Sequence, residues 1–527
     1  MVLSGHAKDE NYCFLNLSFF MVDEKYRFHN DQRRVFMFPT KKLFLKLASV
    51  LSLALAHQYA MCDESIVVFE DEFISLAREH ENDELFIEEA TEEELLQLRA
   101  VNPRKPTTII IYIAADNDLH PFAWKNIKQM ESIGSNENVN VLVQLNTPGY
   151  NNPTKRYVIK QGKRLLVPAD GTAPTQKLNS GSPYTLIDCA AWAMKYYPAD
   201  NLVINLWDHG SGVYDPGSAR IVKSSDLFRF NKDTNMLELN HVGDYNDLIT
   251  ENDGQDLRQN GRGICFDETF KSYINNQDLK FALSEIQNKV LGGKKIGILW
   301  FDACLMAMLE IADLCKDHVE YLVASEEVEY ASGSNYEMVL RPFVDQPLTS
   351  RELACHIVSC FEKAYQNITR DFTQSAMDLS LIAPLEDNVN LVAMQLLYAL
   401  QDQKNGSVTK LLQQCKTRPF CTCFEEPTYI DLRNFYSNLQ ANANSISLNN
   451  PTSEGSIKYA LQRLLDQGIN LINKAVIANK VGSNQHRAGG ISIYFPERGM
   501  FNSYPKCNFA KTNNWSSMII QYLISKK

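Results

Sequence analysis

Short apolar runs rich in β-branched residues alternate with segments of helical periodicity between residues 106 and 345. The first run, 107–113, contains only Thr, Ile and Tyr, a composition typical of a strand buried on both faces. The other strand-like runs are 139–145, 202–206, 296–300 and 321–324. The helical segments among them are 183–197 and 306–314. This order predicts an α/β fold with a mostly parallel central sheet and helices on both faces.

The rest of the chain has a different pattern. A length of 527 residues exceeds what one hydrophobic core usually serves, so we expect a second part beside the α/β domain. Residues 346–527 are mainly helical in pattern, with the longest candidates at 391–400 and 457–478. A late strand is expected at 491–495, as a candidate to rejoin the sheet. Residues 61–105 are dense in Glu and Asp and are interpreted as an acidic, propeptide-like linker.

Residues 1–60 are interpreted as a leader. Lysines precede the apolar run 47–56, and small residues follow it, which is the pattern of a secretory signal peptide over about 37–60. Translation from Met37 would give this signal a basic start, in which case residues 1–36 are not translated. A membrane anchor is the alternative, but the apolar run is shorter than the ~20 residues that a span needs. We therefore expect a secreted or periplasmic protein without stable membrane insertion.

Net charge and cysteine spacing disfavour a nucleic-acid partner and a structural metal site. The net charge of −11 disfavours nucleic acid as a partner, because phosphate neutralisation needs clustered Lys and Arg. The 12 cysteines form no Cys-x-x-Cys pair and no zinc-finger spacing, so no structural metal site is expected. Export would permit disulfides, and Cys415, Cys421 and Cys423 lie close enough in sequence for some pairing.

Two of the predicted strands lead into reactive residues. The strand 202–206 is followed by His209 and Gly210, and the strand 296–300 is followed by Asp302 and Cys304. Functional groups gather beyond the carboxyl ends of parallel strands, where an imidazole can hold a cysteine as its thiolate or accept its proton.

We also expect Cys304 to begin a helix. The positive end of that helix would lower the thiol pKa, and the N–H groups of Cys304 and Gly210 would form an oxyanion hole. The alternative is a buried, inert cysteine and a hydrogen-bonded turn histidine.

Six blocks, taken in order, resemble the clostripain family of cysteine peptidases. One of them is the string WDHGSG at 207–212, and another is FDACLM at 301–306. The resemblance spans roughly 107–385, with a weaker echo at 490–496. The full set of blocks is 112–119, 206–212, 262–269, 301–306, 324–327 and 375–380.

This resemblance implies a caspase-like α/β sandwich with a largely helical C-terminal part. It implies a dyad of His209 and Cys304, hydrolysis after basic residues of peptides and proteins, and often activation by internal cleavage. Asp302 matches the acid that lines the S1 pocket, where a carboxylate would pair with an Arg or Lys side chain.

The sequence departs from the family pattern at one point. Ser332 stands where the family often carries an acid, and Glu326, Glu327 and Glu329 are candidates either to recognise a basic substrate or to form a solvated loop. This departure keeps open a secreted binding protein without turnover. A different thiol hydrolase or a transpeptidase, which uses the same attack but delivers the acyl group elsewhere, is a third hypothesis. A serine hydrolase is disfavoured because no Gly-x-Ser-x-Gly elbow occurs.

No cofactor or metal is expected to be required. Asp116 and Asp118 suggest calcium, which some family members use, but two carboxylates fall short of the six or more oxygens that calcium takes. The favoured interpretation of Asp118 is a helix N-cap, with Pro121 in the first turn of the helix.

A polar segment separates the two dyad residues. Residues 213–261 are rich in Asn and Asp and show little periodicity, so they are interpreted as an insertion in the catalytic domain. Loops of this length are usually either functional or disordered. An enzyme with basic specificity would find self-cleavage sites in this insertion at Arg220, Lys223, Arg229, Lys232 and Arg258.

Overall fold

The computed structural model describes residues 90–169, 173–213, 228–231, 236–239, 263–501 and 503–526, and only the backbone of 228–231 and 236–239. The predicted leader, most of the acidic linker and most of the insertion at 213–261 lie outside the described residues. Four of the proposed self-cleavage sites also lie outside them, namely Arg220, Lys223, Lys232 and Arg258.

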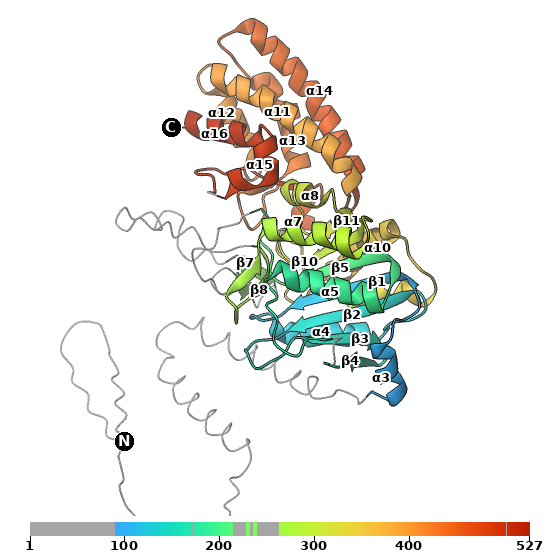
Figure 1. Ribbon diagram of the computed structural model, residues 1–527. Helices are drawn as coiled ribbons and strands as arrows, with labels where there is room; N and C mark the ends of the chain where they lie inside the picture. Colours follow the sequence, from blue (N-terminus) through green and yellow to red (C-terminus); the bar gives the residue numbers. More distant parts are fainter. Residues whose placement is uncertain are drawn as a thin grey trace, which may run out of the picture. The chain divides into compact units, whose positions relative to one another are not determined.

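A nine-stranded sheet forms the centre of the described region, in the order β14-β12-β11-β10-β5-β1-β2-β3-β4 (Figure 1). The five strands from β11 to β2 in this order are parallel to one another, and the strands outside them pair antiparallel. The strands are β1 (Lys105–Ala114), β2 (Val139–Asn146), β3 (Lys155–Lys160), β4 (Lys163–Leu166), β5 (Ala199–Trp207), β10 (Ile296–Asp302), β11 (Val319–Ala324), β12 (Thr373–Asp378) and β14 (Val476–Val481).

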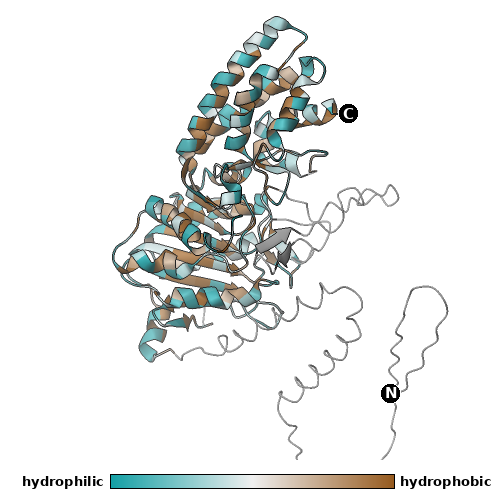
Figure 2. Cartoon of the chain, turned by 180° about the vertical axis from the view of Figure 1, so that it is seen from behind, coloured by the Kyte–Doolittle hydropathy of each residue, from teal (hydrophilic) through white to brown (hydrophobic). Residues whose placement is uncertain are grey.

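The parallel strands are apolar because they are covered on both faces. Every residue of β2 and β10 is buried, as are the last eight residues of β1. Figure 2 shows these strands as the brown, hydrophobic centre of the sheet, with helices of mixed colour beside them. The predicted α/β fold with a mostly parallel sheet is therefore confirmed.

Two groups of helices cover the sheet. Helices α5, α7 and α8 contact one another in series, and α4, α9 and α10 form a second series. Right-handed crossovers place α4 on the face opposite α5, because the chain steps from β1 to β2 in one direction and from β2 to β5 in the other. These helices are α4 (His120–Glu131), α5 (Pro183–Tyr196), α7 (Asn276–Glu285), α8 (Leu309–Cys315), α9 (Tyr336–Leu340) and α10 (Ser350–Tyr365).

The C-terminal part is largely helical, as expected, and contacts the sheet domain through α8, which touches both α11 and α15 (Figure 1). None of the helices in the described part of the chain combines the length and apolarity needed to cross a bilayer. The remaining helices are α3 (Glu92–Arg99), α11 (Ile382–Asp402), α12 (Ser407–Lys416), α13 (Leu432–Asn442), α14 (Pro451–Ala475), α15 (Asn508–Thr512) and α16 (Trp515–Ser525).

The late strand and the long helix expected in the C-terminal part are both present, at Ser492–Tyr494 and Pro451–Ala475, but each differs from the expectation in one respect. The strand expected at 491–495 does not rejoin the large sheet, because β15 pairs antiparallel with β13 in a separate two-stranded sheet. The helix expected at 457–478 ends at Ala475, and the chain then enters β14, which pairs with β12 at the edge of the large sheet. The small sheets consist of β6 (Phe228–Asn231) with β7 (Met236–Leu239), β8 (Ile264–Asp267) with β9 (Ser272–Ile274), and β13 (Tyr429–Asp431) with β15 (Ser492–Tyr494).

Candidate active site

The predicted dyad residues follow two neighbouring strands. Strands β5 and β10 are parallel neighbours, and Trp207 at the end of β5 is in register with Asp302 at the end of β10. His209 and Cys304 each come two residues later, at the same edge of the sheet. A Cβ atom at Gly210 would lie 2.5 Å from the carbonyl oxygen of Cys304, so the glycine permits the close approach of the two loops.

The thiol of Cys304 is fully buried in this structure. Its Sγ accepts a hydrogen bond from the backbone N–H of Glu329, with the nitrogen 3.2 Å from the sulfur. Burial raises the pKa of the Cys304 thiol well above its usual range, and this hydrogen bond offsets only part of the effect. The resting thiol is therefore protonated at neutral pH.

Cys304 does not begin a helix, contrary to the sequence-based expectation. Helix α8 begins at Leu309, and Leu305 has a φ of 65°, a left-handed conformation that is uncommon outside glycine. The backbone N–H of Ala307 donates to the carbonyl oxygen of Ser325 at 2.8 Å. Because these residues bond to the neighbouring loop, the positive end of the helix is not available to lower the thiol pKa.

His209 is held by an aspartate from a third strand end. Its imidazole is fully buried, and its Nε2 lies 2.7 Å from Oδ1 of Asp118, in the loop after β1. Burial by itself would lower the imidazole pKa, but the Asp118 carboxylate reverses this, and the pKa of His209 is raised overall. The N-cap of α4 is Leu119, so the expected capping role of Asp118 is wrong.

The contact between Asp118 and His209 leads to a prediction. We expect Asp118→Asn to lower the imidazole pKa, because a carboxylate that favours the imidazolium is lost. The acidic limb of the pH profile of kcat/KM, which reports loss of the proton from the His209 base, should then move to lower pH, with a loss of roughly 10- to 100-fold at the optimum. Peptidase assays across the pH range would measure both effects. An unchanged acidic limb would show that Asp118 does not set the protonation of His209.

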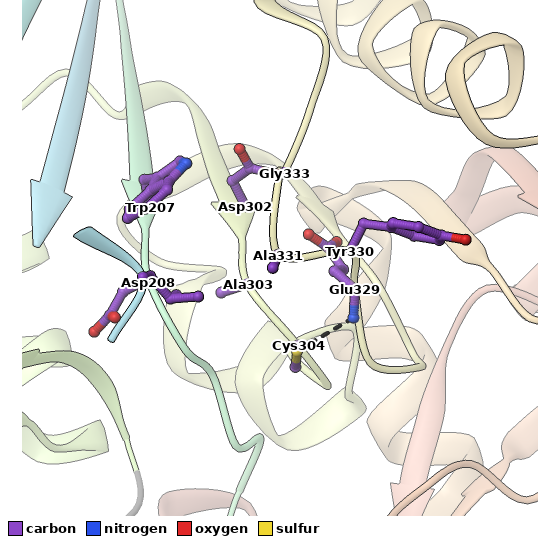
Figure 3. Close-up of a pocket in the computed structure, with 10 residues that line it drawn as sticks. Trp207, Asp208, Asp302, Ala303, Cys304, Glu329, Tyr330, Ala331 and Gly333 are labelled. Atoms are coloured by element: carbon purple, nitrogen blue, oxygen red, sulfur yellow. Dashed lines mark hydrogen bonds between the residues drawn. The ribbon is translucent and has the colours of Figure 1, made fainter. Parts of the chain in front are cut away.

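Asp302 lies in the wall of a small pocket beside Cys304 (Figure 3). Its carboxylate accepts hydrogen bonds from the backbone N–H and Oγ of Ser334, both at 3.0 Å, and from the hydroxyl of Tyr336 at 2.6 Å. Asp302 is the last residue of β10, and it does not cap α8, which begins at Leu309. Burial raises its pKa, and these hydrogen bonds oppose the rise.

The glutamates of the segment 326–329 do not form a solvated loop, because all three are buried. Glu326 accepts from the backbone N–H of Gly490 at 3.0 Å, and Glu327 accepts from that of Glu425 at 2.8 Å, so both connect this segment to the C-terminal part. Glu329 alone of the three lines the pocket beside Cys304. The carbonyl oxygen of Ser332 accepts from Asn126 Nδ2 at 3.0 Å.

The two aspartates suggested for calcium have different protein partners. Asp116 pairs with Nζ of Lys177 at 2.7 Å, whereas Asp118 pairs with His209. Within the described ranges, no three His, Cys, Asp or Glu side chains are grouped as a metal site would require. The ten described cysteines are free thiols, among them the three considered for disulfide pairing, Cys415, Cys421 and Cys423.

Comparisons with known proteins point to one family. A model of the clostripain family matches residues 111–244 and 227–521 of this chain. Clostripain of Hathewaya histolytica is 21% identical over 261 residues, which are 45% of this chain and 42% of that protein, so less than half of that relative's length is matched.

Two solved structures from Bacteroides thetaiotaomicron are also similar. The secreted C11 cysteine protease iotapain aligns with a TM-score of 0.51 at 13% identity, over 79% of this chain and all of its own, which supports the shared fold. A secreted C11 cysteine protease in complex with an irreversible peptide inhibitor aligns with a TM-score of 0.46 at 19% identity, over 79% of this chain and 99% of its own.

Proposed function

Because the chain belongs to the clostripain family of cysteine peptidases, we propose that it is a secreted endopeptidase that cleaves after Arg or Lys through Cys304 and His209. One observation carries the proposal. The two residues follow adjacent parallel strands at the same edge of the sheet, and Asp302 is the strand residue two positions before the thiol. Peptides and proteins are the substrates, and secretion rests on the signal-like segment 37–60.

The proposed mechanism starts from a neutral thiol. His209 accepts the proton of Cys304 as the sulfur attacks the carbonyl carbon of the scissile bond. The resulting imidazolium is stabilised by Asp118 and donates its proton to the leaving amine, which leaves a thioester on Cys304. Water then hydrolyses the thioester with His209 as the base. The Gly210 N–H is the proposed oxyanion donor, and no cofactor takes part.

Substrate access requires a change in this closed site. Cys304 and His209 are both 0% exposed, so a peptide bond reaches the sulfur only after the covering segments move. Cleavage after one of the basic residues within 213–261 is the proposed activating step. Arg229 is the proposed cleavage site that falls within the described residues, in strand β6.

Asp302 is proposed to bind the basic side chain of the P1 residue. A carboxylate buried in a small pocket pairs with a guanidinium or an ammonium group by charge-assisted hydrogen bonds. A neutral side chain in the same pocket would leave the charge of Asp302 uncompensated. The pocket should therefore select cationic P1 residues over neutral ones.

The Asp302→Asn variant tests this selection. We expect cleavage of peptides with P1 Arg or Lys to fall by roughly 100- to 1,000-fold in kcat/KM, because the buried cation loses its counter-charge. Asparagine keeps one acceptor oxygen for the two Ser334 donors, and its amide N–H can donate to the Tyr336 hydroxyl in place of the bond that Oδ2 accepts, so the loop should stay in place. Matched peptides with neutral P1 residues provide the comparison. An equal fall for basic and neutral peptides would refute the pocket role.

One experiment tests the proposed activity as a whole. Fluorogenic peptides with P1 Arg, Lys or a neutral residue are incubated with the purified protein, with and without iodoacetamide. Turnover of the basic peptides that alkylation abolishes would support the proposal. No turnover of any peptide would favour a binding protein, and acyl transfer to an added amine would identify a transpeptidase.

A further inference from the structure

The pocket beside Cys304 contains a second buried acid besides Asp302. Glu329, in the loop after β11, lines the same pocket and is 3% exposed (Figure 3). Ser332, which stands where related sequences often carry an acid, does not line it. Three acidic residues therefore line the pocket despite the serine, and the third, Asp208, already accepts hydrogen bonds from Asn117 Nδ2 and the backbone N–H of Phe266.

The carboxyl group of Glu329 has one unused oxygen. Its Oε1 accepts a hydrogen bond from Gln374 Nε2 at 3.1 Å, whereas its Oε2 is buried and makes no hydrogen bond to any described residue. A buried polar atom without a partner is unfavourable and calls for an explanation. Because Glu329 lines the pocket, a bound ligand is the natural source of the missing donor.

Asp302 has the charge to bind a cation but little remaining capacity to accept hydrogen bonds. A carboxylate offers about four lone-pair positions. The backbone N–H of Ser334 lies 3.0 Å from Oδ1 and 3.1 Å from Oδ2 of Asp302. The Ser334 hydroxyl also donates to Oδ1, and the Tyr336 hydroxyl donates to Oδ2. A guanidinium group brings several N–H donors, so a second acceptor is needed.

The two acids interact with each other. Burial raises the pKa of Glu329 well above its usual range, and the charge of Asp302 raises it further. The other titratable groups that interact with Glu329 are Cys304, Tyr336 of α9 and Tyr365 of α10, all of them neutral in their protonated form. In the empty pocket Glu329 is therefore protonated.

We propose that Glu329 is a second specificity-determining residue, which binds the basic P1 side chain together with Asp302 and releases its proton to solvent when that side chain enters. The inference rests on the proposed function. The empty pair carries one negative charge, and two carboxylates with one bound cation also sum to one negative charge. The exchange of a proton for the substrate cation thus leaves the net charge of the buried site unchanged.

The proton exchange predicts a pH dependence of P1 specificity that ionisation of the dyad does not produce. While Glu329 is protonated in the free enzyme, productive binding of a P1 Arg requires the loss of one proton. The ratio of kcat/KM for a P1 Arg peptide to that for its neutral citrulline analogue should rise with pH, by up to about tenfold per pH unit. Ionisation of His209 and Cys304 affects both peptides equally, so their contribution cancels in the ratio.

The test compares the active enzyme with its Glu329→Gln variant, using Arg and citrulline peptides of otherwise identical sequence. Glutamine keeps the acceptor for Gln374 and the backbone N–H that bonds to Cys304. We expect roughly 10- to 100-fold lower kcat/KM for Arg, a change below about threefold for citrulline, and a ratio that is constant with pH. Glu337→Gln is the matched control, because Glu337 lies exposed on α9 in an ion pair with Arg341.

The possible failures are distinguishable. A wild-type preference for Arg that persists in Glu329→Gln with the same pH dependence would overturn the role of Glu329 and leave the proposed function intact. Equal cleavage of Arg and citrulline peptides by the wild type would overturn the proposed P1 specificity itself. The wild-type ratio needs no variant, so a ratio that does not change with pH would overturn the proton exchange even if the glutamine variant failed to fold.

Discussion

Cys304→Ala is expected to lower peptidase turnover by roughly 10⁴- to 10⁶-fold, because it removes the sulfur that would form the covalent intermediate. The fold should remain intact. The substitution deletes one small buried atom, which costs about 1 kcal/mol in the free energy of unfolding. Steady-state assays and thermal unfolding of the same preparation would measure both effects.

Cys315→Ala provides the matched control. Cys315 is also a fully buried thiol whose pKa is raised by burial, and it lies in α8, 11 positions further along the chain. We expect it to lose a similar amount of stability and to keep its activity. Wild-type turnover in Cys304→Ala, or equal losses of activity in the two variants, would contradict the assignment of the nucleophile.

His209→Ala is expected to cause the next largest loss, roughly 10³- to 10⁴-fold at neutral pH. Burial raises the pKa of the Cys304 thiol, so the sulfur needs a base to become a nucleophile. Without the imidazole only solvent can take this proton. The residual activity should therefore rise with pH up to about pH 10, in contrast to the optimum of the wild type.

Measurement of kcat/KM from pH 6 to pH 10 would test this behaviour. His318→Ala is a suitable control, because His318 lies away from the pocket and bonds to Gln287 Oε1 at 2.8 Å. A His209→Ala variant that keeps the wild-type optimum would show that another group accepts the thiol proton.

Local patterns in the sequence account for most of the sheet. The runs 107–113, 139–145, 202–206, 296–300 and 321–324 all lie within parallel strands, because strands buried on both faces need continuous apolar residues. These patterns also explain why His209 and Cys304 could be placed just beyond two strand ends from the sequence. Residues just beyond the ends of parallel strands meet at one edge of the sheet, whatever the details of packing.

The start of the helix near the site was predicted less well from the sequence. The apolar spacing at 306–314 suggested a helix close to Cys304, but residues 305–308 form contacts with distant segments instead. Met308 pairs with Ser492 of β15, and Ala307 donates to Ser325 in the loop after β11. Sequence periodicity reports local spacing and contains no information about such long-range partners.

The sequence by itself determined the α/β fold, the strand ends at which the reactive residues lie and the family to which the chain belongs. Only the tertiary structure decided that Asp118 contacts His209, that Ser334 and Tyr336 occupy the carboxylate of Asp302, and that Glu329 lines the pocket in place of Ser332. The physical reason is that hydrogen bonds and burial depend on distances between segments far apart in the chain. The pKa values of these acids follow from the same distances.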